Sequence, residues 1–200
     1  MKGILLLAIM ASTIVLADVQ PLMIGQPVPE GSLQTVDNKA FDLREEADRQ
    51  PLAVVFYRGG WCPYCNRHLA GLQAIDPQLR DLGYRILAIS PDRPEKLAET
   101  VDKDHLTYTL LSDSSMAMAK AFGIAFTVDE ATLEKYKGYG IDLEASSGEE
   151  HHMLPVPSVF LVGTDGIIDF VYSNPDYKVR LDPDVLLAAA KVAVRASEKK

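Results

Sequence analysis

The chain of 200 residues has little cysteine, no excess of positive charge and few long apolar runs. Two cysteines are too few for a disulfide-stabilised scaffold or, by themselves, a four-thiolate zinc site, but they suffice for one redox pair. Twenty Lys and Arg against 28 Asp and Glu give a formal net charge of −8, which argues against a nucleic-acid-binding surface. The 13 glycines and 12 prolines are near average usage, which excludes collagen-like and low-complexity chains.

The N-terminal stretch predicts export. A positive start at Met1-Lys2 precedes an almost wholly apolar run over residues 3–17, whose Val15-Leu16-Ala17 ending is typical of a signal-peptidase site. The run is shorter than the ~20 residues that cross a bilayer comfortably. We therefore expect a signal peptide over residues 1–17, cleavage after Ala17 and an exported, periplasmic protein, with a retained anchor as the alternative. No later segment is apolar for long enough to cross a membrane.

Residues 18–200 alternate strand and helix patterns without a repeat or a low-complexity block, which predicts one domain. Continuous apolar runs predict strands buried on both faces, and apolar residues three or four apart predict amphipathic helices. We expect strands over 52–57, 85–90 and 108–111, helices over 69–82, 91–101 and 116–122, a hairpin over 158–172 and a closing helix over 183–195. This order predicts an α/β fold with a mixed sheet covered by helices on both faces.

The chemistry concentrates in the Cys62-Pro63-Tyr64-Cys65 motif, which joins the first buried strand to the first long helix. Backbone N–H groups lack partners at a helix start and the helix dipole is positive there, so a thiolate is favoured over a thiol. We expect the pKa of Cys62 to lie below that of a free thiol and Cys65, one turn further on, to be more shielded. Such a pair attacks with one sulfur and resolves with the other, as a dithiol oxidoreductase requires.

Three other roles for these cysteines stay open at this point. A structural disulfide suits an exported protein, although so short a loop constrains the unfolded chain little. Cys62 and Cys65, with His68 and either His151 or His152, offer ligands of the types that zinc takes, but no second Cys-x-x-Cys or His-x-x-His cluster accompanies them. Two buried free thiols are the third alternative. The strand-to-helix position of the motif favours redox chemistry over all three.

These motifs resemble a known family. A strand followed by Trp61-Cys62-Pro63-Tyr64-Cys65 and a helix resembles the thioredoxin fold, and Cys-Pro-Tyr-Cys matches glutaredoxins. The rest of the chain, over about residues 25–195, is more similar to the peroxiredoxin-like family, also called alkyl hydroperoxide reductase/thiol-specific antioxidant. The similar segments are residues 88–97 (AISPDRPEKL), 111–113, 119–123 and 159–166 (VFLVGTDG). The resemblance implies a thioredoxin-like sheet flanked by helices, with an insertion over residues 125–152 before the C-terminal hairpin.

The chain departs from the peroxiredoxin pattern where a peroxide would bind. Aligned on Phe56-Tyr57, the pattern puts Cys65 at the position of the peroxide-attacking cysteine, Cys62 in place of a Thr or Ser, and Arg58 in place of a Pro. The family's catalytic Arg falls on Pro157. That proline instead resembles the cis-proline of thioredoxins, which faces the Cys-x-x-Cys and offers backbone hydrogen bonds to a substrate chain; packing is its alternative role. These departures favour disulfide exchange over peroxide reduction.

Two further side chains are candidates for substrate binding. Trp61, beside Cys62, offers a flat contact surface, with core cover as the alternative. Arg58 lowers a cysteine pKa if it turns inward, whereas an arginine at a strand end is more often solvated. No acidic residue lies between residues 51 and 65, which leaves the proton acceptor for Cys65 unidentified.

The insertion over residues 125–152 is too long to be inert by default. Tyr136, Tyr139 and the neighbouring glycines predict a mobile flap that borders the cysteines. The alternative is a surface excursion with one helix.

We favour an exported thiol–disulfide oxidoreductase in which Cys62 attacks a disulfide and Cys65 resolves the mixed disulfide. The first alternative is a thiol peroxidase, in which one cysteine becomes a sulfenic acid and the other condenses with it. The second is a metal-binding module that uses the same cysteines. The expected partners are a disulfide or hydroperoxide, on a protein or a small molecule, and a redox partner protein. Neither nucleic acid nor, after signal removal, membrane is expected, and the favoured reaction needs no cofactor and no metal.

The helix-start argument predicts which sulfur reacts first. Iodoacetamide at neutral pH should label Cys62 before Cys65 in the reduced protein, because Cys62 is the thiolate. Peptide mapping by mass spectrometry reads out the order of labelling. Preferential labelling of Cys65 would overturn the assignment.

Overall fold

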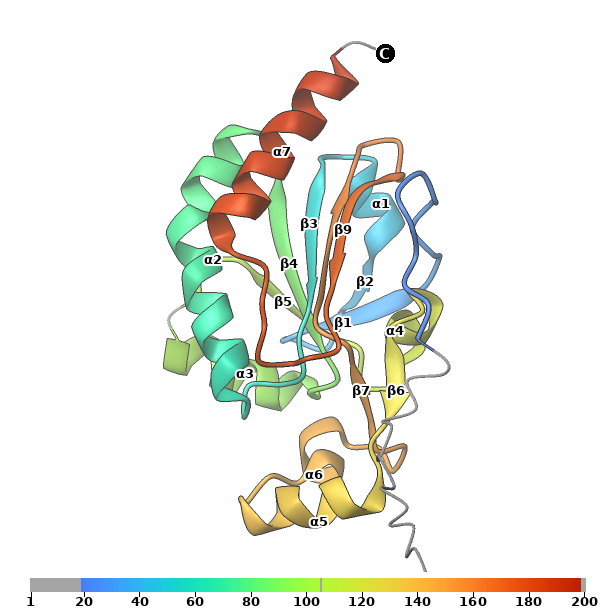
Figure 1. Ribbon diagram of the computed structural model, residues 1–200, viewed down its shortest axis with the longest axis vertical. Helices are drawn as coiled ribbons and strands as arrows, with labels where there is room; N and C mark the ends of the chain where they lie inside the picture. The colour runs from blue at the N-terminus through green and yellow to red at the C-terminus, as the bar shows by residue number, and fades with distance from the viewer. Residues whose placement is uncertain (1–18, 105, 199–200) are drawn as a thin grey trace, which may run out of the picture.

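The computed structural model describes residues 19–104 and 106–198, so the predicted signal peptide lies outside the described part of the chain. A seven-stranded sheet at its centre has the strand order β2-β1-β5-β4-β3-β8-β9 (Figure 1). The strands of this sheet are β1 (Ser32–Thr35), β2 (Ala40–Asp42), β3 (Leu52–Phe56), β4 (Arg85–Ser90), β5 (Thr109–Ser112), β8 (Ser158–Val162) and β9 (Ile168–Ser173). The helices are α1 (Leu43–Ala47), α2 (Pro63–Asp81), α3 (Pro94–Asp104), α4 (Ala117–Ala121), α5 (Glu130–Gly138), α6 (Leu143–Ser147) and α7 (Pro183–Ser197).

Strand β3 is the centre of the sheet and positions the cysteines at its end. It pairs in parallel with β4 and antiparallel with β8, and all five of its residues are buried. A strand that is buried on both faces needs apolar side chains at every position, which is why its sequence is the unbroken run Leu-Ala-Val-Val-Phe. The mixed α/β sheet predicted from the sequence is therefore confirmed.

The two faces of β3 belong to two separate cores. Ala53, Val55 and Tyr57 pack with apolar residues of α2 and α7 on one face, and Val54 and Phe56 pack with residues of α1 and α4 on the other. Figure 1 shows α2 and α7 side by side on one side of the sheet, with α1 and α4 on the opposite side. Helix α2 thus starts at the end of β3 and runs back along the first face, which holds its N-terminus close to the strand end.

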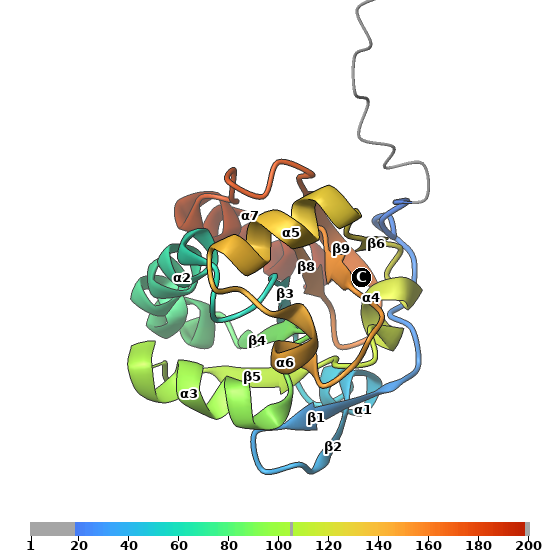
Figure 2. The ribbon, with the colours of Figure 1, turned by 90° about the horizontal axis from the view of Figure 1, so that it is seen from below.

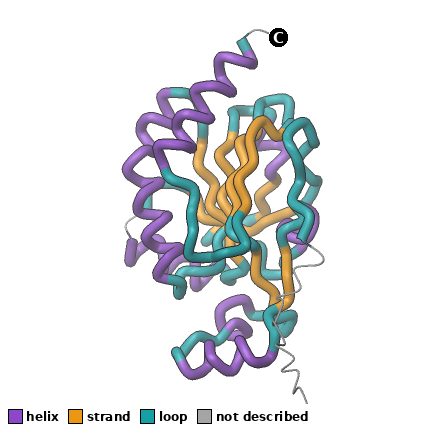
Figure 3. The backbone as a smooth tube through the Cα atoms, viewed as in Figure 1, coloured by secondary structure: helices purple, strands orange, loops and turns teal. Residues whose placement is uncertain are grey.

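The insertion forms a small unit below the main sheet. Strands β6 (Ala125–Thr127) and β7 (Met153–Pro155) pair with each other in a two-stranded sheet, and α5 and α6 lie between them in sequence. Figures 2 and 3 show these two helices across one end of the main sheet, joined to it through the β6–β7 pair. The alternative interpretation, a surface excursion with one helix, gave too few helices, because the second helix has only five residues and shows no helical periodicity in the sequence.

Other differences from the predicted elements are small. The hairpin of β8 and β9 and the closing helix α7 are confirmed, and α3 starts at Pro94 and not at Pro91. Strands β1 and β2 and helix α1 were not predicted, since each has five residues or fewer. Among the described residues, no helix combines the length and the apolar character needed to cross a membrane.

The core on the α4 side of the sheet predicts how much stability is lost when the aromatic ring of Phe160 is removed. Phe160 is fully buried, with its ring centroid 4.8 Å from that of Phe122 and 6.1 Å from that of Phe56. Phe160→Ala should lower the free energy of unfolding by about 3–5 kcal/mol, because it leaves a cavity that rigid neighbours cannot fill. Val192→Ala, at an exposed position of α7, is the control and should change it by less than about 0.5 kcal/mol. Urea unfolding measures both, and equal effects would contradict this packing.

Candidate active site

Two glycines form the turn between β3 and α2. Gly59 has φ +146°, and a Cβ atom built on it would lie 2.4 Å from the Trp61 ring nitrogen. A Cβ atom on Gly60 would lie 2.0 Å from the Thr100 hydroxyl oxygen. Side chains at these positions would push the turn outward, so the glycine pair is what lets the chain fold tightly at the strand end. The turn places Cys62 directly before the first residue of α2, with Pro63 at the first helical position.

Cys62 is the thiolate of the pair. Its interaction with the Cys65 thiol contributes most to lowering its pKa, to about 6, and the Cys65 backbone amide and the charges of Arg58 and Arg180 lower it further against the opposing effect of burial. The Cys65 amide is a helix-start donor of the kind predicted from the sequence, and Arg58 acts as predicted for an inward-turned side chain, whereas the effects of the Cys65 thiol and Arg180 were not predicted. At neutral pH, Cys62 therefore carries a negative charge although its exposed fraction is only 1%.

Cys65 is the thiol of the pair. Its side chain is fully buried, and burial together with the neighbouring Cys62 raises the pKa of Cys65 well above its ordinary value. The Arg180 guanidinium donates a hydrogen bond to the Cys65 sulfur across 3.2 Å and favours its ionised form. Arg180 comes from the segment between β9 and α7, more than a hundred residues further along the chain, and sequence reasoning missed it.

The Arg58 side chain turns inward and is only 3% exposed, so it is not the solvated side chain considered as the alternative. Its guanidinium carbon lies 4.1 Å from the ring centroid of Tyr177, 5.1 Å from that of Trp61 and 5.5 Å from that of Tyr136. It also donates a hydrogen bond to the Tyr136 hydroxyl. Neither Arg58 nor Arg180 forms an ion pair with a carboxylate of the described residues. For Arg58, the faces of the aromatic rings stabilise the buried positive charge instead.

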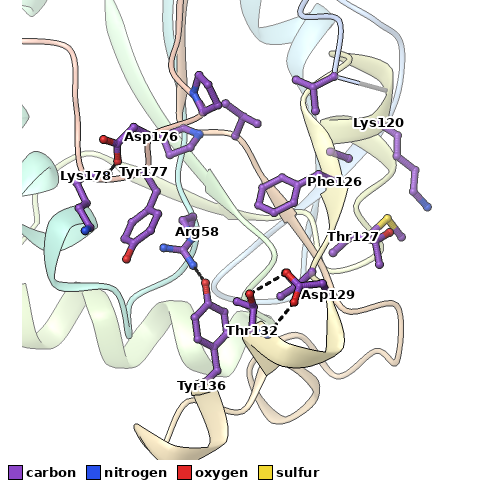
Figure 4. Close-up of a pocket in the computed structure, with 17 residues that line it drawn as sticks. Arg58, Lys120, Phe126, Thr127, Asp129, Thr132, Tyr136, Asp176, Tyr177 and Lys178 are labelled. Atoms are coloured by element: carbon purple, nitrogen blue, oxygen red, sulfur yellow. Dashed lines mark hydrogen bonds between the residues drawn. The ribbon is translucent and has the colours of Figure 1, made fainter. Parts of the chain in front are cut away.

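A cavity of about 720 Å³ opens beside Arg58. Figure 4 shows Arg58 and Tyr177 on one side of it, Phe126 and Thr127 on the other, and Tyr136 below. Its walls are mostly apolar, and Lys120 and Lys178 add two further cations. The lining includes Arg58, Tyr136 and Tyr177 but neither cysteine, so the cavity reaches Arg58 and not the cysteine sulfurs.

Pro157 lacks the cis peptide bond of the thioredoxin proline that it resembles. No cis peptide bond occurs among the described residues, and Pro157 lies in the wall of the cavity. Its carbonyl accepts a hydrogen bond from the Asn174 amide, and the amide of Val156 donates to the Ile124 carbonyl. The Pro157 carbonyl and the Val156 amide are therefore already hydrogen-bonded within the fold.

The insertion borders the site, as the flap interpretation predicts. Tyr136 of α5 stacks against Trp61, with ring centroids 5.7 Å apart, and accepts the hydrogen bond from Arg58. Trp61 therefore packs against both the insertion and a site cation, which is packing of the kind considered as its alternative role. His151 and His152 lie elsewhere, against the Ser114 carbonyl and the Glu144 carboxylate.

The predicted zinc ligands do not come together. His68 lies one turn after Cys65 on α2, and burial and the charge of Arg180 lower its pKa to about 4. Within residues 19–104 and 106–198, no group of three or more His, Cys, Asp or Glu side chains is placed to hold a metal ion.

Asp92 is a second residue that sequence reasoning missed. It follows β4, is 2% exposed, and its carboxylate accepts hydrogen bonds from the Gly60 amide (2.8 Å) and the Ser90 hydroxyl (3.1 Å). Burial raises the pKa of Asp92 to about 6 against these two bonds. The sequence around Asp92 gives no local signal for this position. It depends on the pairing of β4 with β3, the strand that leads to the cysteines.

Comparison with known proteins decides the family. The sequence profile of the AhpC/TSA family matches residues 24–171. The chain belongs to this family. Peroxiredoxin Bcp of Escherichia coli is 34% identical over 104 residues, which cover 52% of this chain and 66% of that protein. A Bcp relative from Haemophilus influenzae is 35% identical over the same shares of the two chains. The matched part is thus just under two thirds of these relatives' length.

Solved structures of the same family share the fold. Peroxidoxin BcpB from Mycobacterium tuberculosis has a TM-score of 0.66 at 18% identity, covering 86% of this chain and 96% of that chain. Peroxiredoxin Q from Xanthomonas campestris has a TM-score of 0.64 at 22% identity, covering 82% and 91%. These likenesses confirm the predicted thioredoxin-like fold. The relatives that the chain matches are named peroxiredoxins, which supports the peroxidase alternative over disulfide exchange or metal binding.

The geometry of the pair predicts its titration. Ultraviolet thiolate absorbance of the reduced protein should show one thiolate forming with a midpoint of about pH 6. Cys65→Ala should move this midpoint upward, because it removes the thiol whose interaction lowers the pKa of Cys62 most. Cys62→Ser is the control and should abolish the step below neutral pH. A step that survives in Cys62→Ser would show that Cys65 is the thiolate.

Proposed function

We propose that this protein is a thiol peroxidase that reduces hydroperoxides with the Cys62/Cys65 pair, and that Cys62 is the attacking sulfur. The observation that carries the proposal is a thiolate at Cys62 flanked by a buried, carboxylate-free arginine that also lines the cavity. The thiolate is the reactive form of cysteine, and Cys65 is held as a thiol. The attacking sulfur therefore occupies the position where other family members have a Thr or Ser.

The first step is attack of the Cys62 thiolate on the terminal oxygen of a hydroperoxide. The S–O bond forms and the O–O bond breaks, which leaves a sulfenic acid on Cys62 and an alkoxide or hydroxide that takes a proton from solvent. Negative charge moves from sulfur to the leaving oxygen during this step. The Arg58 guanidinium, which has no carboxylate to neutralise it, is the group we assign to stabilise that charge.

The second step closes the disulfide. The Cys65 sulfur attacks the sulfenic sulfur of Cys62, the S–S bond forms, and hydroxide leaves as water after taking a proton. Arg180 stabilises negative charge on the Cys65 sulfur as its proton departs, since it already donates a hydrogen bond to that sulfur. A dithiol protein partner then reduces the disulfide by thiol exchange and returns the pair to its starting state.

The cavity beside Arg58 indicates which kind of hydroperoxide the protein would bind. Its apolar walls include Phe126, Val128, Met153 and Val156, and they suit the carbon chain of an organic hydroperoxide whose O–O group meets Arg58. Access from the cavity to Cys62 requires the Arg58–Tyr136 contact to open. We also propose that the protein is exported, on the strength of the apolar run over residues 3–17.

A single-turnover experiment tests the function. The reduced protein should lose its thiols to hydrogen peroxide or cumene hydroperoxide at least about 10²-fold faster than dithiothreitol does, and Cys62→Ser should abolish this rate. Arg58→Met should slow it by about 10²-fold through the loss of charge stabilisation. Arg67→Met, at an exposed arginine of α2, is the matched control and should keep the wild-type rate. Slow peroxide reaction together with rapid insulin reduction would instead support disulfide exchange.

A further inference from the structure

Cys65 has no evident partner for its proton in the scheme above. It is fully buried and protonated, yet its sulfur has to act as a nucleophile when the disulfide closes. Cys62 and Tyr57 belong to the same buried cluster as Cys65, the Arg180 guanidinium donates a hydrogen bond to its sulfur, and the Arg58 backbone also interacts with it. Cys62 is oxidised at this stage, and an arginine is a donor only. Of these groups, Tyr57 alone has a hydroxyl that can pass a proton on.

Tyr57 connects Cys65 to a buried carboxylate. It directly follows β3, and its amide donates to the Ile89 carbonyl, which places Tyr57 beside Ser90 on the neighbouring strand. The Tyr57 hydroxyl is buried and makes no hydrogen bond of normal geometry with the described residues. Its pKa is raised well above the ordinary value by burial and by the negative charges of Asp92 and Cys65, while the nearby Ser90 hydroxyl lowers it.

We propose that Asp92 is the proton acceptor for the Cys65 thiol, acting through the Tyr57 and Ser90 hydroxyls in the step that closes the Cys62–Cys65 disulfide. The inference rests on the proposed peroxidase function. The Cys65 proton passes to the Tyr57 hydroxyl as that group releases its own proton toward Ser90 and Asp92. The Cys65 electron pair forms the S–S bond, the S–O pair leaves as hydroxide, and Asp92 afterwards returns its proton to solvent, so that the net product is water.

The surroundings of Asp92 suit this role. Its carboxylate accepts a hydrogen bond from the Gly60 amide, which ties the proton acceptor to the turn that carries the cysteines. Asp92 also lines a second cavity, of about 240 Å³, together with Lys96 and Glu99, which gives the proton a route to solvent. Lys96 lowers and Glu99 raises the pKa of Asp92, but burial is the largest effect, and Asp92 becomes a carboxylate above about pH 6. It is a positioning residue, since it acts on Cys65 through other side chains.

Stopped-flow fluorescence of Trp61, the single tryptophan, separates the two steps after mixing with peroxide. In the wild type, a fast phase reports sulfenic acid formation, and a slower phase reports disulfide closure with a rate that rises with pH through about 6. Asp92→Asn should leave the fast phase unchanged, slow the second phase by about 10-fold or more at neutral pH, and remove its rise near pH 6. Glu99→Gln is the matched control, because it removes a carboxylate beside the same cavity, and it should keep the wild-type second phase at neutral pH.

Tyr57→Phe gives a second test that does not depend on the folding of Asp92→Asn. The hydroxyl that it removes makes no normal hydrogen bond, so its loss should not lower stability, yet it should slow the second phase like Asp92→Asn. An unchanged second phase in both variants, or an equal slowing in Glu99→Gln, would overturn the role of Asp92. Absence of the fast phase in the wild type would instead contradict the peroxidase proposal itself, so the two failures are distinguishable.

Discussion

A thiolate in the interior of a protein is stable only if the protein replaces the water that would otherwise surround it. Here the replacement is the start of α2: the Cys65 thiol and amide act on the Cys62 sulfur, and Arg58 and Arg180 supply positive charge. Most other features of the site follow from this interaction. The glycine turn is needed to bring Cys62 to the helix start, and the aromatic rings are needed to hold a buried Arg58 without a carboxylate that would cancel its charge.

The same constraint separates the roles of the two sulfurs. Two adjacent buried thiols cannot both ionise, because the charge on one raises the pKa of the other. Cys62 therefore holds the charge before peroxide arrives, and Cys65 has to lose its proton afterwards. Once Cys62 is oxidised, its negative charge no longer opposes the ionisation of Cys65. The sequence of events in the proposed reaction is thus set by which sulfur is ionised at each stage.

Local sequence was enough to predict the parts of the site that lie on one continuous segment. The buried run of β3, the Cys62-Pro63-Tyr64-Cys65 motif and the start of α2 are consecutive, so periodicity and helix-end chemistry locate the cysteines. The hairpin was predicted for the same reason, from two strand-like runs on either side of Thr164-Asp165-Gly166. The insertion over residues 125–152 does border the site, through Tyr136, although its two helices and its β6–β7 pair were too short to predict.

The residues that sequence reasoning missed all reach the site across the sheet. Arg180 and Tyr177 come from the irregular segment after β9, and Asp92 comes from the end of a neighbouring strand. The positions of these residues in the site depend on the strand order and on the path of a loop, and neither produces a local pattern in the sequence. The preference for disulfide exchange over peroxide reduction was based on the same kind of local reasoning. It treated Pro157 as evidence against a catalytic arginine, whereas the folded chain brings two other arginines to the cysteines.

The central claim is that Cys62, and not Cys65, attacks the peroxide, and the location of the sulfenic acid tests it most directly. Cys65→Ser and Cys62→Ser would each receive one equivalent of hydrogen peroxide in the presence of dimedone, and mass spectrometry would locate the adduct. The account predicts rapid dimedone labelling of Cys62 in Cys65→Ser and little labelling of Cys65 in Cys62→Ser, because only Cys62 is a thiolate at neutral pH. Rapid labelling of Cys65 in Cys62→Ser, with little at Cys62 in the other variant, would contradict it.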